Sequence, residues 1–277
     1  MSLVIIAIAF VSSLFFSSCS KDKYDPVTPS VPLIATSMSY DKDGVLDEMI
    51  TLQYDKERRL TKMIYNDGSY DLLEYSGSTV TLKNYEDEKL DYVAVAKLNN
   101  QGLCISISSD NEYYSSTIEY DINGYRRLSM SESATRIYTE RRTITDGNYG
   151  IINSENNPKT NKSATLRELD IFPRSGFLNF FRRKYMSKTS LKSTADYNEK
   201  TEYQFYTGKT NTIEDENYGV SFNGKQNKNP IKQETRTYYW DGSTTETTTY
   251  TYEYDTKGRI TKQITDDGSY IVFTYVD

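Results

Sequence analysis

A repeated phrase constrains this chain more than any other feature of its sequence. Tyr54–Tyr70 reads YDKERRLTKMIYNDGSY and Tyr254–Tyr270 reads YDTKGRITKQITDDGSY, so ten of seventeen positions are identical at an offset of 200 residues. The identities are spread over turn residues and the strand-like residues beside them, whereas a shared catalytic site would leave isolated matches around reactive side chains. The duplicated unit is therefore predicted to be a β-hairpin module.

Loops of the form Tyr-Asp-x-x-Gly, or close to it, recur along the chain. In such a loop the Asp side chain accepts hydrogen bonds from backbone amides further along, and Gly takes the positive φ that closes the turn. Arg58 stands where the other copies have Gly, so its loop is expected to be strained or differently shaped. The loops begin at Asp41, Asp55, Asp121 and Asp255, with a weaker version at Asn99, and Asp-Gly turns occur at Asp67, Asp146, Asp241 and Asp267.

Period-two alternation flanks these turns. In Thr247–Asp255 three tyrosines point one way and Thr and Glu residues the other, which is typical of a half-buried strand. Strands and turns follow at short spacing without a βαβ rhythm. The predicted fold class is all-β, an antiparallel meander closing into a barrel or a curled half-barrel, with the two repeated hairpins near its ends. The mean hydropathy of −0.69 argues against a lipid-facing barrel.

One stretch, roughly residues 153–194, departs from the strand pattern. Phe177, Leu178, Phe181 and Tyr185 have helical spacing beside a basic cluster, which favours a short helix closing one end of the barrel. A basic amphipathic element touching a membrane or an anionic ligand, or an irregular loop, remains an alternative. Residues 223–233 lack periodicity and are predicted to form an exposed loop. The body, residues 35–277, is predicted to be a single β domain.

The N-terminus has the pattern of an export signal. Residues 1–18 are uncharged and largely apolar, too short for a spanning helix and suited to a signal peptide. Phe16–Cys19 resembles a bacterial lipobox, which implies cleavage before Cys19 and lipid attachment to its sulfur; an ordinary cleaved signal is the alternative. The Asp-containing stretch after Cys19 resembles the surface-export signal of Bacteroidota lipoproteins. Residues 19–34, with three prolines, are predicted to be a flexible tether.

The composition argues against several kinds of active and binding site. The chain has no His, which excludes Ser-His-Asp and Cys-His nucleophiles and His-ligated metals, and no metal or cofactor is expected. With 39 acidic against 33 basic residues, the chain is a poor candidate for binding nucleic acid. Cys104 lies in a strand pattern with no His to activate it, so a buried, inert thiol is predicted.

The phrase Tyr254–Lys262, and more loosely Tyr54–Lys62, resembles the YD repeats of Rhs-type proteins, where it is a hairpin signature. Together with the N-terminal signal and the Tyr-rich strands, it makes the chain resemble a family of Bacteroidota envelope lipoproteins with a porin-like β fold. The resemblance covers roughly residues 35–277. It implies a barrel-like domain on the cell envelope and no established activity or site residues.

The leading hypothesis is a non-enzymatic outer-membrane lipoprotein, exposed at the cell surface, that binds a glycan, a lipid or an outer-membrane protein. The lipid on Cys19 would hold it on the membrane, and the 26 tyrosines offer aromatic faces to a ligand. One alternative is a carboxylate-based glycan hydrolase, which requires two carboxylates about 5–10 Å apart in one cleft. Another is a purely structural surface protein. No catalytic residue is assigned.

Overall fold

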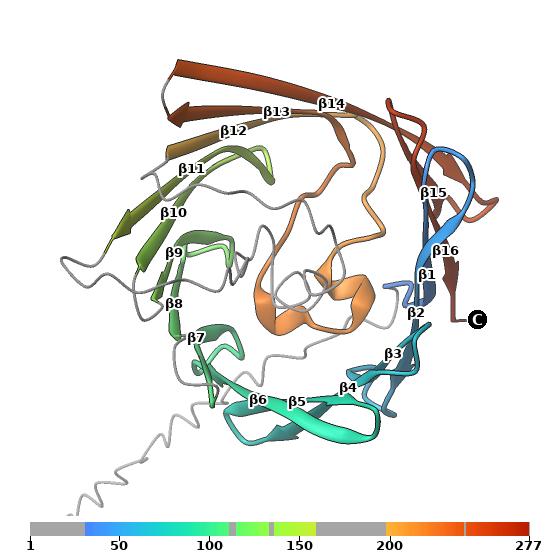
Figure 1. The fold of residues 1–277 in the computed structure, drawn as a ribbon, viewed down its shortest axis with the longest axis vertical. Helices are drawn as coiled ribbons and strands as arrows, with labels where there is room; N and C mark the ends of the chain where they lie inside the picture. Colours follow the sequence, from blue (N-terminus) through green and yellow to red (C-terminus); the bar gives the residue numbers. More distant parts are fainter. Residues whose placement is uncertain (1–30, 111–114, 133–135, 159–197, 241, 277) are drawn as a thin grey trace, which may run out of the picture.

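The chain forms a closed antiparallel barrel of sixteen strands in which each strand pairs with its sequence neighbour (Figure 1). The computed structural model describes residues 31–110, 115–132, 136–158, 198–240 and 242–276. The strands are β1 Ile34–Tyr40, β2 Leu46–Tyr54, β3 Leu60–Tyr65, β4 Tyr70–Ser76, β5 Thr79–Glu86, β6 Lys89–Leu98, β7 Cys104–Ser109, β8 Ser115–Tyr120, β9 Arg126–Glu132, β10 Arg136–Thr145, β11 Asn148–Pro158, β12 Asn198–Phe205, β13 Ile231–Trp240, β14 Gly242–Tyr254, β15 Ile260–Thr265 and β16 Tyr270–Tyr275.

The barrel closes where the first strand meets the last. β1 pairs with β16 in antiparallel register, from Ser37 opposite Phe273 to Tyr40 opposite Tyr270. Closure pairs the backbone groups that an open sheet would leave at its two edges. The predicted all-β meander is confirmed, and its form is the closed barrel.

The turns contain the Asp-to-amide hydrogen bonds that the repeated phrase predicts. Asp55 Oδ1 accepts the amides of Glu57 and Arg59, both at 2.9 Å, and Asp255 does the same for Lys257 and Arg259 at 2.9 and 2.8 Å. The loops at Asp41, Asp121 and Asn99 repeat this pattern. Arg58 takes the left-handed conformation of its counterpart Gly258, with φ of 64° against 78°. Its loop therefore has the same shape as the others and carries backbone strain, since a left-handed residue with a Cβ is unfavourable.

An internal segment occupies the barrel. Residues 206–230, here called the plug, leave the wall after β12, run inside the ring and return at β13 (Figure 1). The plug contains two short 3-10 helices, η1 Asp215–Tyr218 and η2 Ser221–Asn223. The predicted exposed loop over residues 223–233 is wrong at both ends, because Asn223 is only 1 % exposed and residues 231–233 belong to β13, whereas Lys225 and Lys228 between them are exposed. This segment shows no strand or helix periodicity, so the sequence pattern does not reveal that it lies inside the barrel.

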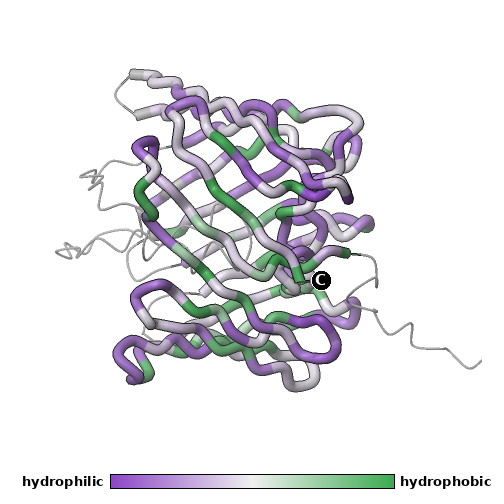
Figure 2. The backbone as a smooth tube through the Cα atoms, turned by 90° about the vertical axis from the view of Figure 1, so that its right-hand side faces the viewer, coloured by the Kyte–Doolittle hydropathy of each residue, from purple (hydrophilic) through white to green (hydrophobic). Residues whose placement is uncertain are grey.

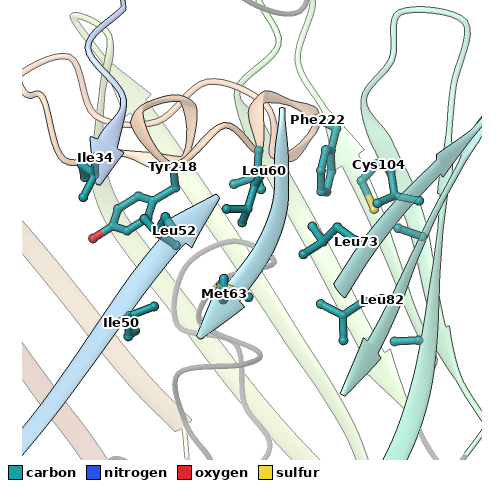
Figure 3. Packing of buried hydrophobic residues seen from close by; sticks show 14 of the residues in the cluster. Ile34, Ile50, Leu52, Leu60, Met63, Leu73, Leu82, Cys104, Tyr218 and Phe222 are labelled. Atoms are coloured by element: carbon teal, nitrogen blue, oxygen red, sulfur yellow. The ribbon is translucent and has the colours of Figure 1, made fainter. Parts of the chain in front are cut away.

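The inner wall has an apolar part and a polar part. Tyr218 and Phe222 of the plug pack on the apolar part (Figure 3), and Val220 belongs to the same buried cluster. Burying a side chain the size of Phe222 contributes about 2 kcal/mol. The apolar part carries Ile50, Leu52, Leu60, Met63, Leu73, Val80, Leu82, Ala94, Ala96, Cys104, Ile107, Ile118, Ile260 and Phe273. The polar part, on β9–β13, carries Ser129, Ser131, Glu140, Arg142, Ser154, Glu199, Thr201 and Glu234.

Hydrophilic and hydrophobic residues are interspersed along the strands over the full height of the barrel wall (Figure 2). Residues 243–247 of β14 are all exposed Ser, Thr or Glu, so both faces of the strand meet solvent there. The described residues include no helix long and apolar enough to cross a membrane.

The predicted insertion begins later than the sequence indicated. β11 continues to Pro158, so residues 153–158 are strand residues paired with β10. The loop-like composition of this stretch was overridden by cross-strand pairing. The rest of the insertion, including the helix predicted around Phe177, lies outside the described residues, as do Cys19 and the tether up to residue 30.

Candidate functional site

A polar cavity of about 250 Å³ lies inside the barrel, between the plug and the polar part of the wall. It exists on this side because β10–β13 turn charged and hydroxyl side chains inward, whereas the opposite wall packs directly on the plug. Strands supply Arg142, Tyr149, Ile152, Tyr203, Ile231, Glu234, Arg236, Tyr252 and Gln263, and the plug supplies Asn211, Ile213, Glu214, Gln226 and Asn227.

Arg142 and Tyr149 form the β10–β11 side of the cavity. The Arg142 guanidinium pairs with the carboxylate of Glu140 on the same strand, Nε to Oε1 at 2.5 Å, and both side chains are almost completely buried. It also lies over the Tyr149 ring, 4.8 Å from the centroid. A cation in such a place keeps its charge because its partner and the ring face replace water.

Tyr149 also fastens the plug to the wall. Its hydroxyl donates to the carbonyl oxygen of Lys225 at 2.8 Å, and its backbone amide donates to Asn227 Oδ1 at 2.8 Å. The plug is thus attached to the cavity wall by directional bonds, in addition to its apolar contacts on the other side.

Glu234 and Arg236 form an ion pair on β13, two residues apart and therefore on the same face of the strand. The Tyr250 hydroxyl donates to Glu234 Oε2 at 3.4 Å. Burial, and next the charge of Glu234, raise the pKa of Tyr203 well above its ordinary value. This side of the cavity therefore offers a neutral phenol beside a fixed pair of charges.

Glu214 faces the cavity from the plug. Burial raises the pKa of its carboxyl to about 8, with Asp215 and Glu216 adding repulsion and Arg142 opposing it. The carboxyl accepts a hydrogen bond from Asn211 Nδ2. At neutral pH most of this carboxyl is protonated, so Glu214 can donate a hydrogen bond as well as accept one.

These groups together suit a small polar molecule. The cavity presents guanidinium and amide donors, carboxyl and amide acceptors and tyrosine rings, in the mixture that hydroxyl-rich ligands need. In the part of the chain that the structure describes, no three His, Cys, Asp or Glu side chains gather in a way that could hold a metal ion.

Sequence reasoning assigned none of these residues. The available signal was the spacing Glu140-x-Arg142 and Glu234-x-Arg236, which places opposite charges on one face of a strand. Nothing in the sequence shows that these two charged strand faces, one on β10 and one on β13, both point into the barrel. Cys104 is fully buried as predicted, and burial raises the pKa of its thiol to about 11. Cys19, the predicted lipid-attachment residue, lies outside the described residues.

The fold and the cavity define the class, a closed sixteen-stranded antiparallel barrel with an internal plug. The chain is similar to a porin-like protein from Bacteroides uniformis, with a TM-score of 0.52 and 14 % identity over 88 % of this chain and 96 % of that one. It is also similar to a porin-like protein from Bacteroides vulgatus, with a TM-score of 0.56 and 10 % identity over 88 % of this chain and 99 % of that one. No family model and no curated protein matches the sequence. At these identities the likeness shows the fold.

Proposed function

We propose that this protein is a non-enzymatic, lipid-anchored protein of the cell envelope that binds a saccharide inside its barrel. The observation that carries the proposal is the lining of the cavity, where tyrosine rings stand among Arg, Glu, Gln and Asn side chains. Aromatic faces and bidentate polar groups are the two features that sugar rings engage. The porin-like fold shared with two Bacteroides proteins supports an envelope location.

The size of the cavity limits the ligand. At about 250 Å³ the cavity is smaller than the roughly 300–1,000 Å³ pockets that hold drug-sized ligands. That is room for about one sugar unit, and a longer glycan would have to leave its other units outside. The expected ligand is therefore the end of a glycan, or a free monosaccharide.

Calorimetric titration of the full chain with a panel of mono- and oligosaccharides tests this proposal. Gln263→Leu removes a side-chain amide from the cavity wall. It should weaken saccharide binding about tenfold, because one hydrogen-bonding partner is lost in an enclosed site. Gln53→Leu, the same change at an exposed position of β2, is the matched control and should bind like the native protein. The proposal fails if no saccharide binds saturably or if both variants bind like the native chain.

A second candidate, a carboxylate-based glycan hydrolase, is favoured by one observation. Glu214 and Glu234 line the same cavity, the first mostly protonated at neutral pH and the second paired with Arg236. A carboxyl with a raised pKa and a second carboxyl in the same cleft are what glycosidases use as acid and base. Both groups already have structural partners, Asn211 for Glu214 and Arg236 for Glu234, which favours binding over hydrolysis.

Product analysis separates the two candidates. If the protein is a hydrolase, it releases reducing sugar from a bound glycan, and Glu214→Gln abolishes release while binding persists. If it is a binding protein, the native chain returns the glycan intact. The third hypothesis, a purely structural surface protein, predicts no saccharide binding at all.

The anchor is proposed from the sequence around Cys19 and is tested by cell fractionation. The native chain should be recovered with the outer membrane and be accessible to protease on intact cells. Cys19→Ala should release it from the membrane, because no thioether to lipid can form. A Cys19→Ala chain that stays membrane-bound like the native protein would refute the lipid anchor.

A further inference from the structure

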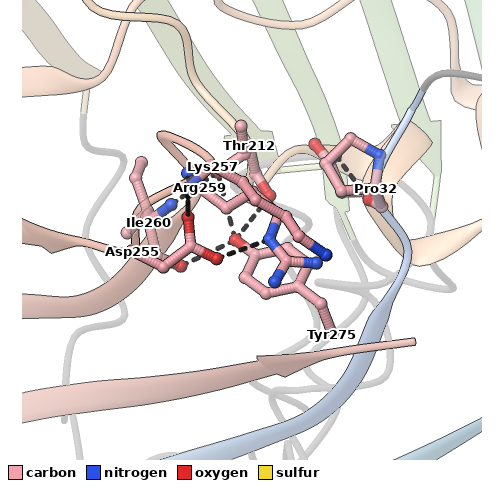
Figure 4. A network of polar contacts seen from close by, with 8 residues as sticks. Pro32, Thr212, Asp255, Lys257, Arg259, Ile260 and Tyr275 are labelled. Atoms are coloured by element: carbon pink, nitrogen blue, oxygen red, sulfur yellow. Dashed lines mark hydrogen bonds and ion pairs between the residues drawn. The ribbon is translucent and has the colours of Figure 1, made fainter. Parts of the chain in front are cut away.

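A second cavity, an open groove of about 720 Å³, lies at the barrel rim beside the second copy of the repeated hairpin. Its walls are the Tyr254–Arg259 loop, the start of the plug and Pro32 (Figure 4). Among the residues that the structure describes, three cations, Lys209, Lys257 and Arg259, line it with one carboxylate, that of Asp255. The remaining lining residues are Gly208, Thr210, Thr212, Tyr254, Thr256 and Gly258.

In the first copy of the hairpin, two carboxylates neutralise the arginine Arg59. Arg59 Nη2 bonds two carboxylates, Asp55 Oδ2 at 2.7 Å and Glu57 Oε2 at 2.6 Å. The guanidinium carbon lies 4.4 Å from the centroid of the Tyr75 ring, which fixes its plane. Both carboxylates come from the loop itself, so the first copy needs no outside anion.

The second copy keeps the arginine and loses one of its carboxylates. Arg259 bonds Asp255 Oδ2 through Nε at 2.6 Å and lies 4.5 Å from the Tyr275 ring centroid, as in the first copy. The residue at the position of Glu57 is Lys257, so a carboxylate has been exchanged for an ammonium. Lys209 adds another charge from the plug, with Nζ 4.8 Å from the Tyr254 ring centroid.

The second copy also leaves space where the first is filled. Arg58 extends from its loop and donates from Nη2 to the carbonyl oxygen of Val31 at 2.8 Å. Gly258, at the equivalent position, has nothing within 4 Å of where a Cβ would lie. The groove therefore opens where an arginine side chain is missing, next to the position of the missing carboxylate.

We propose that this rim groove binds a compact anion of the phosphate type, which takes the place that the Glu57 carboxylate occupies in the first copy. Arg259 supplies the planar fork that bonds phosphate or carboxylate oxygens, and Lys257 and Lys209 supply two further point charges in the same groove. The site is separate from the interior cavity and does not depend on a saccharide binding there.

Two sources could present such an anion at the rim, a free phosphorylated metabolite or the headgroup of a lipid. Two soluble probes distinguish them. Inorganic phosphate measures the affinity for the anion alone. Dihexanoyl phosphatidic acid carries the same phosphate group on a short-chain lipid. Equal affinity for the two probes assigns the site to free phosphate chemistry, whereas tighter binding of the lipid probe assigns it to a headgroup. Dihexanoyl phosphatidylcholine, with no net charge, measures binding through the acyl chains alone.

The deciding experiment titrates both anionic probes into the full chain and observes phosphorus resonances by NMR. Lys257→Glu rebuilds the first copy's carboxylate in the groove and should weaken both probes at least tenfold, since a charge-assisted contact becomes repulsive. The loop accepts Glu at this position in the first copy, so the variant should fold. Lys209→Gln, on a different element, should weaken both probes severalfold.

Lys56→Glu is the matched control, because it makes the same charge change in the first copy's loop, away from the groove. It should bind both probes within about twofold of the native chain. Thermal unfolding of every variant confirms that the barrel is intact. The proposal is overturned if the native chain shows no saturable binding, if Lys257→Glu binds like the native chain, or if Lys56→Glu loses as much affinity as Lys257→Glu.

Discussion

The backbone amide of Leu60 donates a hydrogen bond to the carbonyl oxygen of Gly219 at 3.1 Å, which fastens the plug to the first copy of the repeated hairpin. Ile260, the equivalent residue of the second copy, donates its amide to Thr212 Oγ1 at 2.8 Å. Leu60 and Ile260 are both fully buried. The duplicated hairpins thus hold the same internal segment at two points, on β3 and on β15.

Gly219→Ala should strongly destabilise the protein. Gly219 has φ of 71°, and a Cβ there would lie 2.8 Å from the backbone nitrogen of Leu60 and 2.8 Å from Tyr54 Cε1. Strain in the left-handed region and the clash together should cost about 2–4 kcal/mol in the free energy of unfolding. Urea unfolding followed by circular dichroism measures this.

Gly258→Ala is the control for that variant. Gly258 has φ of 78° but open space around it, so only the backbone strain applies, about 1 kcal/mol. Equal losses for the two variants would show that the close contact of Gly219 with β3 does not contribute to stability, contrary to the attachment of the plug at Leu60.

Tyr75→Phe and Tyr275→Phe should each lower the free energy of unfolding by about 1 kcal/mol. The Tyr75 hydroxyl donates to the Leu60 carbonyl at 2.8 Å, and the Tyr275 hydroxyl donates to the Ile260 carbonyl at 2.6 Å. Removing either hydroxyl leaves a carbonyl beside the plug without this donor. Tyr239→Phe, at a 48 % exposed position, should change stability by a few tenths of a kcal/mol at most. Chemical denaturation of the three variants decides whether the buried hydroxyls matter.

Stability should fall as the pH rises through the range set by Glu214. Its pKa is about 8 in the folded protein against an ordinary value of 4.5. Between these values the folded state keeps a proton that the unfolded state has lost, so its contribution is greatest at low pH and is lost towards pH 8. Arg142, Asp215 and Glu216 are the charges that act on it.

Glu214→Gln removes this titration. Relative to the native chain, the variant should gain stability steadily when urea unfolding is repeated from pH 5 to pH 8. Parallel pH profiles for the two chains would mean that Glu214 titrates normally and that the cavity does not shield it from water.

Cys104 should resist thiol reagents in the folded protein. It is fully buried, and burial raises the pKa of its thiol to about 11, which leaves little thiolate at pH 8. In a Cys19→Ala chain, an aromatic disulfide reagent should react slowly under native conditions and completely in denaturant. Fast stoichiometric labelling of the native chain would disprove the burial.

The sequence could predict the local structure because turn chemistry is local. Asp55 and Asp255 bond amides two and four residues ahead, and such bonds depend only on the loop that contains them. Alternation in strands such as β14 is equally local. The same reasoning failed for residues 153–158, whose strand conformation depends on pairing with β10.

By itself, the sequence determined most of the strands, their turns and the order in which neighbours pair, since these depend on residues close together in the chain. Tertiary structure alone decided that residues 206–230 lie inside the barrel and that Glu214 meets Glu234 and Arg142 around one cavity. It also decided that Lys209 joins Lys257 and Arg259 in one groove. These residues are distant in sequence and share no periodicity, and only closure of the barrel around the plug brings their charges together.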